Sequence, residues 1–90
     1  MAAKIEVTGN GDNFQVVVSE GGGQTRHQVH VAAAELQRLA PGAPPTRVIE
    51  AAFRFLLDRE AKESILSRFG LNEISRYFPE FERDISAYLP

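Results

Sequence analysis

The chain has 90 residues, no cysteine and a formal net charge of -2, with 10 Lys and Arg against 12 Asp and Glu. This length supports one hydrophobic core, so we treat residues 1–90 as a single small domain. The lack of cysteine excludes a disulfide framework and thiolate chemistry, and the slightly negative charge argues against generic binding to a nucleic-acid backbone.

The first third of the chain has the two-residue apolar period of β-strands. Apolar and polar residues alternate over residues 3–8, again from Phe14, and a third time over residues 24–31. The Gly- and Asn-rich stretch between the first two runs predicts a hairpin loop of more than two residues, and consecutive glycines separate the second run from the third. We therefore expect a three-stranded antiparallel meander, residues 3–31, with one buried face.

The apolar period then changes to about 3.6, as in amphipathic helices. A short helix is expected over residues 32–39, and a stronger helical pattern begins after Thr46, its expected N-cap. Because polar residues interrupt that pattern, residues 46–69 are consistent with either one helix or two. Residues 32–89 thus predict four to five helices packed on one face of the meander, which makes the fold class α+β.

The two histidines, His27 and His30, lie in the third predicted strand. Three residues apart on a strand, they face opposite sides and cannot chelate one metal together. We expect His27 to be a hydrogen-bonded core residue and His30 to face solvent. A ligand-binding site or enzyme around His27 is one alternative hypothesis, but neither a phosphate-binding glycine loop nor a Gly-x-Ser-x-Gly elbow accompanies it. We predict no catalytic residue, metal or cofactor, which favours a non-enzyme without deciding the question.

Residues 61–78 place Gly70 between two apolar stretches, an arrangement that resembles a helix-turn-helix. The register differs from that motif, because Ile74 is four residues after Gly70 and the sixth residue is Arg76. A structural helical hairpin, with Gly70 ending its first helix, is the favoured interpretation. A nucleic-acid-binding regulator using residues 61–78 is the second alternative function.

Aromatic residues are concentrated near the end of the chain, at Tyr77, Phe78, Phe81 and Tyr88. Packing onto the sheet explains them most simply, although aromatic and Arg side chains also form interface hot spots. Val17 interrupts the polar face of the second strand and suggests that something covers this face. The candidate interaction surface therefore comprises Arg76, Tyr77, Phe81, Tyr88 and Val17.

The stretch Phe53–Glu60 (FRFLLDRE), followed by Ser64-Ile65-Leu66 and then by residues 74–80, resembles the matching stretch of small uncharacterised bacterial proteins. The likeness covers about half of the chain. It implies a bacterial origin and no particular chemistry, so no functional residue is transferred from it.

These patterns predict a non-catalytic protein–protein interaction module. Its partner is an unidentified protein or a second copy of the chain, as in a homodimer. The first residues lack the apolar run of a signal peptide, and no stretch approaches the roughly 20 apolar residues of a membrane span. We therefore expect a cytoplasmic protein without a membrane segment.

Overall fold

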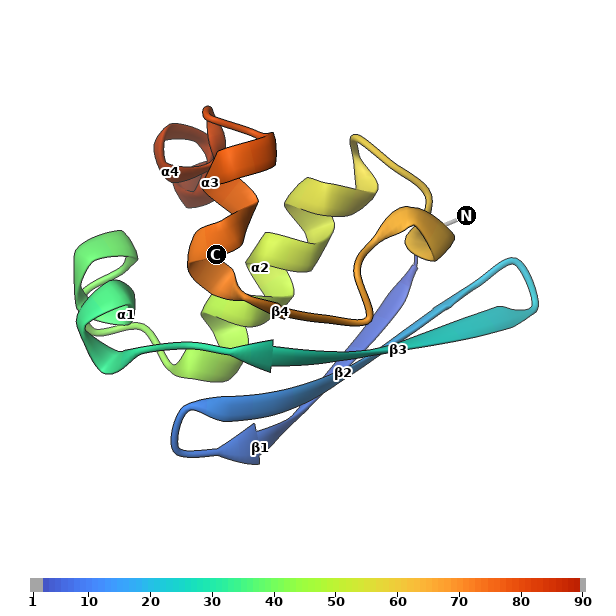
Figure 1. The fold of residues 1–90 in the computed structure, drawn as a ribbon, viewed down its shortest axis with the longest axis horizontal. Coiled ribbons are helices and arrows are strands. Elements are labelled where there is room, and N and C mark those ends of the chain that lie inside the picture. Colours follow the sequence, from blue (N-terminus) through green and yellow to red (C-terminus); the bar gives the residue numbers. More distant parts are fainter. Residues whose placement is uncertain (1–2, 90) are drawn as a thin grey trace.

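The computed structural model describes residues 3–89 and has an α+β fold, with a sheet on one side and helices on the other (Figure 1). The strands β1 (Lys4–Asn10), β2 (Asn13–Glu20) and β3 (Gly23–His30) form the predicted antiparallel meander. A short fourth strand, β4 (Arg68–Gly70), lies parallel to β3, so the sheet order is β1-β2-β3-β4.

The strand β4 corrects the expectation of three strands. The sequence pattern assigned Phe69 to a helix that ends at Gly70, but Phe69 lies opposite Val29 of β3 and is buried. Gly70 has φ -88°, which is not the left-handed conformation of a helix stop. A Cβ here would lie 2.7 Å from Asn72 Oδ1, which is at the end of an exposed side chain that can rotate away, so the close contact does not require glycine either.

Both hairpin turns contain two residues. Asn10 pairs with Asn13, so the first loop is tighter than the sequence suggested. In the second, Gly21 and Gly22 have φ +64° and +84°, the positive values that both central residues of a type I′ turn require. The consecutive glycines are therefore explained by the geometry of this turn.

The helical part has one long helix and several short ones. Four α-helices are described: α1 (Ala33–Leu39), α2 (Pro45–Leu57), α3 (Ile74–Tyr77) and α4 (Phe81–Asp84). Three 3₁₀ turns accompany them: η1 (Lys62–Ser64), η2 (Leu71–Glu73) and η3 (Ile85–Tyr88). Residues 46–69 thus form neither one long helix nor two, because the chain leaves α2 after Leu57 and reaches β4 through η1. The N-cap of α2 is Pro44 rather than Thr46.

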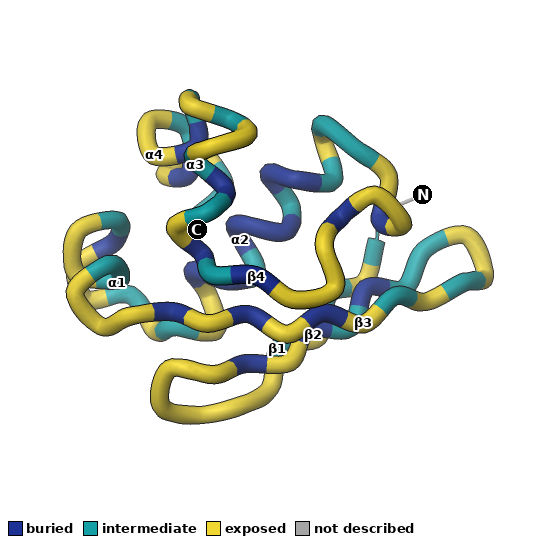
Figure 2. The backbone as a smooth tube through the Cα atoms, viewed as in Figure 1, coloured by how far each residue is buried: buried dark blue, intermediate teal, exposed yellow. Residues whose placement is uncertain are grey.

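The helix α2 lies over the inner face of the sheet (Figures 1 and 2) and carries more of the buried apolar residues than any other element. Its Phe53 ring packs against the sheet, with centroids 5.2 Å from the His27 ring and 5.9 Å from the Phe69 ring. Phe55 packs against the C-terminal segment instead. This helix therefore joins the sheet to residues 78–89. Within residues 3–89, no helix combines the length and apolarity needed to cross a membrane.

Candidate interaction surface

His27 lies in the core between β3 and α2, as the strand alternation predicted, while His30 is exposed. The Nδ1 atom of His27 is 2.7 Å from the Leu66 carbonyl oxygen, and its Nε2 atom is 2.8 Å from the Thr25 hydroxyl. Because a carbonyl only accepts, we place the proton on Nδ1, and the Thr25 hydroxyl can then donate to Nε2. Both ring nitrogens are occupied, so the geometry supports a role in joining β3 to the segment before β4.

The described residues contain neither a metal-ion site nor a helix-turn-helix. Among residues 3–89, no group of three or more His, Asp or Glu side chains is arranged to hold a metal ion. Residues 61–78 form a 3₁₀ turn, a strand, a second 3₁₀ turn and a one-turn helix, so they are neither a helix-turn-helix nor the expected helical hairpin. Arg68 lies on β4 and Arg76 on α3, and no recognition helix presents them together.

The C-terminal aromatic residues surround Phe55 of α2. The Phe55 ring centroid lies 5.9 Å from that of Phe78, 5.1 Å from Phe81 and 5.8 Å from Tyr88, all in edge-on geometry. Phe81 is 1% exposed, and Tyr88 is partly buried. Phe81 therefore belongs to the core, which corrects its assignment to the interaction surface, and Tyr88 packs mainly within the fold.

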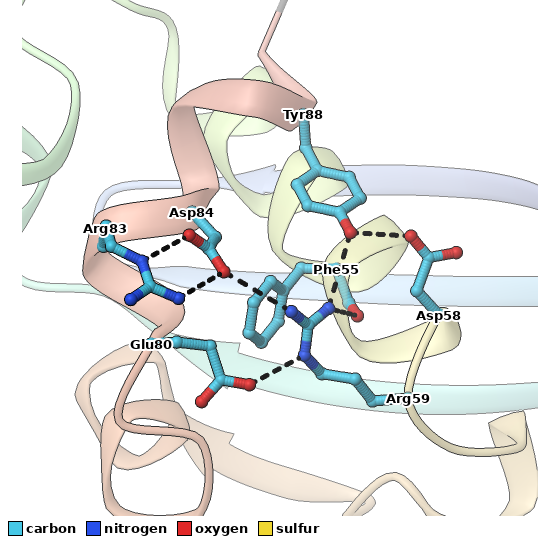
Figure 3. Close-up of polar contacts among 7 residues, drawn as sticks. All are labelled: Phe55, Asp58, Arg59, Glu80, Arg83, Asp84 and Tyr88. Carbon is cyan, nitrogen blue, oxygen red and sulfur yellow. Dashed lines mark hydrogen bonds and ion pairs between the residues drawn. The ribbon is translucent and has the colours of Figure 1, made fainter.

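Arg59, just after α2, holds this aromatic cluster together (Figure 3). Its guanidinium carbon lies 3.6 Å from the centroid of the Phe55 ring. Its Nε donates to a Glu80 carboxylate oxygen at 3.0 Å, and its Nη2 is 3.6 Å from Asp84. The pKa of Glu80 is lowered first by a backbone hydrogen bond and then by Arg59. Arg59 thus connects the end of α2 to the C-terminal segment.

Tyr88 completes the connection from the other side of the guanidinium. Its hydroxyl donates to Asp58 Oδ2 at 2.6 Å and accepts from Arg59 Nη1 at 3.4 Å. Arg59 Nη1 also donates to the Phe55 carbonyl oxygen at 3.1 Å. The side chains of Arg59 and Tyr88 are therefore fixed by the fold, which leaves them poorly suited to adapt to a partner.

A groove of about 300 Å³ opens between the end of α2 and the chain from η1 to α3. Apolar side chains form most of its wall, among them Leu56, Ile65 and Ile74. Leu66 and Tyr77 also line it, and their exposed fractions of 49% and 66% are high for large apolar residues. The groove thus has a buried apolar floor and two large side chains, Leu66 and Tyr77, that the described chain leaves exposed to solvent.

The charged groups of this groove are acidic. Its lining includes Glu60, Ser64 and Glu73, and neither Lys nor Arg is among the described lining residues. The Glu73 carboxylate accepts a hydrogen bond from the Gly70 N–H at 2.7 Å. Burial raises the pKa of Glu60, and within residues 3–89 no cation or hydrogen-bond donor contacts its carboxylate. A positive charge placed beside Glu60 would stabilise its charged form and offset the free-energy cost of burying the carboxylate.

The sequence identified part of this surface. Tyr77 lines the groove, and Arg76 is exposed next to it on α3. Val17 is partly buried on the outer face of the sheet, opposite Glu6 and Arg26 in the register, and so lies on the side away from the helices. Sequence reasoning missed Leu66 and Glu60. The spacing of Leu66 from Ile65 and Phe69 fits the buried face of a helix, and Glu60 lies among residues of both charges that are typical of a solvent-exposed face.

Comparison of the chain with models of protein families, with curated proteins and with solved structures found no match. We therefore infer the function from the geometry of the groove.

Proposed function

We propose that the protein is a non-catalytic interaction module whose groove, between α2 and α3, binds a partner segment that carries a large apolar side chain beside a basic residue. One observation carries this proposal: a 300 Å³ apolar groove has exposed Leu66 and Tyr77 in its wall and carboxylates as its charged groups. Exposed apolar surface of this kind, with polar neighbours, is typical of protein–protein contact sites.

The size of the groove favours a side chain over a cofactor. Small-molecule sites usually span about 300–1,000 Å³, so this groove is at the lower limit. Burying one large apolar side chain contributes roughly 1.5–3 kcal/mol, enough for a contact in which a single anchor supplies much of the affinity. His27 does not line the groove and both of its ring nitrogens are occupied, so it offers no general base to this site.

The charge of the partner follows from Glu60. Its carboxylate is partly desolvated, and burial raises its pKa, so the charged form is less stable than that of a fully exposed Glu. A Lys or Arg of the partner would stabilise the charged Glu60 carboxylate, whereas an Asp or Glu would repel it. The groove should therefore discriminate between partners by charge as well as by shape.

Three fluorescently labelled peptides test this proposal. They share one Leu anchor and differ in the residue next to it, which is Lys, Gln or Glu. We expect affinity by fluorescence anisotropy to fall in that order. Ser64→Trp, which places a large ring in the groove, should weaken binding of the Lys peptide by about tenfold or more, the equivalent of about 1.4 kcal/mol.

Ser67→Trp is the matched control, since Ser67 is exposed and is not among the groove-lining residues. It should leave the affinity of the Lys peptide unchanged. Equal affinity of the native protein and of Ser64→Trp for that peptide would contradict the proposal, as would equal binding of the three peptides.

The pH dependence of binding provides a separate prediction. Protonation of Glu60 removes the negative charge, so affinity for the Lys peptide should fall as the pH is lowered through the raised pKa of Glu60. Glu60→Gln should flatten this profile and bring the Lys and Gln peptides to similar affinities. A profile that is the same in Glu60→Gln as in the native protein would show that another group recognises the basic residue.

A further inference from the structure

The two edges of the sheet differ in length and regularity. The strand β4 has 3 residues and is followed at once by η2, which makes it a short edge. The strand β1 has 7 residues, lacks proline, and pairs with β2 without a bulge from Lys4 to Asn10. Natural edge strands are usually shortened, bulged or covered, because free N–H and C=O groups invite another strand to pair. Within residues 3–89, the edge formed by β1 is neither short, bulged nor covered, and its two charged residues, Lys4 and Glu6, have opposite signs.

No other element of the described chain lies beyond β1. It forms the outer margin of the sheet in Figure 1, where β2 is its one neighbouring strand. A side chain bonds to the backbone of this margin just before the strand, where Arg54 Nη1 donates to the Ala3 carbonyl oxygen at 3.4 Å. The rest of the strand is therefore open to pairing in the structure as described.

The inward-facing side chains of β1 are incompletely covered. Ile5 and Val7 face the same side as Val18 and Val16, their partners on β2. Val16 and Val18 have exposed fractions of 0%, whereas Ile5 and Val7 are only partly buried although they pack on the core. Another strand placed beside β1 would cover these two side chains and continue the core.

We propose that β1 pairs antiparallel with β1 of a second copy about a two-fold axis at Ile5, which joins two sheets into one of eight strands. This goes beyond the proposed function, because the peptide groove lies between α2 and α3 and not at this edge. Each copy would keep its own groove, so the dimer would bind two partner segments.

The charges on β1 favour this register. The pleat requires inward-facing residues to lie opposite inward-facing ones, so the axis passes through a single residue of the strand. An axis at Lys4 or Glu6 would set like charges directly opposite each other, which is unfavourable. An axis at Ile5 places Lys4 of each copy opposite Glu6 of the other. The two side chains are well exposed on the outer face, where their charged atoms lie 4.0 Å apart within one copy.

The same charge complementarity is the reason to propose that the strand pairing with β1 belongs to a second copy of this chain. A strand with Lys, an apolar residue and Glu in succession is complementary to itself when it is paired antiparallel about the central residue. In this register Val7 lies opposite Ala3 of the second copy, a small residue that leaves room for it. Lys4 and Glu6 thus each find a partner of opposite charge in a second copy of the same chain.

Cysteine cross-linking tests the register directly, because the native chain contains no cysteine. Cys residues at the axis face each other at a separation that a disulfide can bridge, whereas residues two positions away from the axis do not face their own copies. Under mild oxidation in dilute solution, Ile5→Cys should form a covalent dimer at least tenfold faster than Val7→Cys. Equal rates, or no covalent dimer from either variant, would overturn the proposal.

A charge exchange tests it again without altering the core, with dimerisation measured by sedimentation equilibrium. Lys4→Glu and Glu6→Lys should each weaken the dimer by about tenfold, because each turns two attractive contacts into repulsive ones. An equimolar mixture of the two variants, or one chain with both changes, should dimerise like the native protein. A monomeric native protein at high concentration, or a mixture no better than the single variants, would refute the pairing. Ser64→Trp should dimerise normally, so failure of the groove proposal would be recognised separately.

Discussion

Phe55→Ala is expected to lower the free energy of unfolding by about 4 kcal/mol, within the range of roughly 3–5 kcal/mol for buried Phe→Ala changes. Phe55 is 0% exposed and lies at the centre of the contacts that hold the C-terminal segment, including the rings of Phe81 and Tyr88. Small domains have a free energy of unfolding of only about 5–15 kcal/mol, so this single change would remove a large part of the stability of the protein. Urea denaturation followed by circular dichroism measures the effect.

Two further variants keep this prediction testable if Phe55→Ala fails to fold. Phe55→Leu retains most of the volume and should cost less, about 1–2 kcal/mol. Tyr77→Ala removes a ring that is 66% exposed and should change the free energy of unfolding by less than about 0.5 kcal/mol. A loss in Tyr77→Ala as large as that in Phe55→Leu would mean that the two aromatic residues have been assigned to the wrong environments.

His27→Ala should cost about 3 kcal/mol, because it leaves a cavity beside Phe53 and removes the hydrogen bond to the Leu66 carbonyl oxygen. His27→Leu fills most of that space, so its smaller loss should report the hydrogen bonds alone, about 1–2 kcal/mol. The amide of Gln28, which donates to the Ser67 carbonyl oxygen at 2.8 Å, should exchange faster with solvent in both variants. Its exchange reports the pairing of β3 with β4.

His30→Ala is the matched control for His27, since His30 is on the same strand and is exposed. Its unfolding free energy and the exchange of the Gln28 amide should stay close to native values. If His27→Ala were no more destabilising than His30→Ala, the buried imidazole would not be joining β3 to the segment before β4.

The sheet was the most predictable part of the molecule. Alternation with a period of two located β1, β2 and β3 and placed His27 and His30 on opposite faces, because one buried face constrains every second residue. The long apolar stripe of α2 was equally clear. The strand β4 was missed because 3 residues are too few to show a period, and the neighbouring spacing of Ile65, Leu66 and Phe69 fits a helix.

The groove depended on contacts between distant residues and was harder to predict. Tyr77 and Phe81 are four residues apart, so a continuous helix would place them on one face. The structure ends α3 at Tyr77 and begins α4 at Phe81, which leaves the first exposed and the second buried. Leu66 is exposed in the groove while its carbonyl is held by His27, 39 positions earlier in the sequence. No local pattern contains that information.

Chemical-shift mapping with the Lys-flanked Leu peptide tests the central claim most directly. In ¹H–¹⁵N spectra of the full chain at saturating peptide, we predict the largest changes at the amides of Glu60, Ser64, Leu66 and Tyr77, with little change on the outer face of β2. An unchanged spectrum at these four amides, or changes concentrated around Val17, would contradict a binding role for the groove.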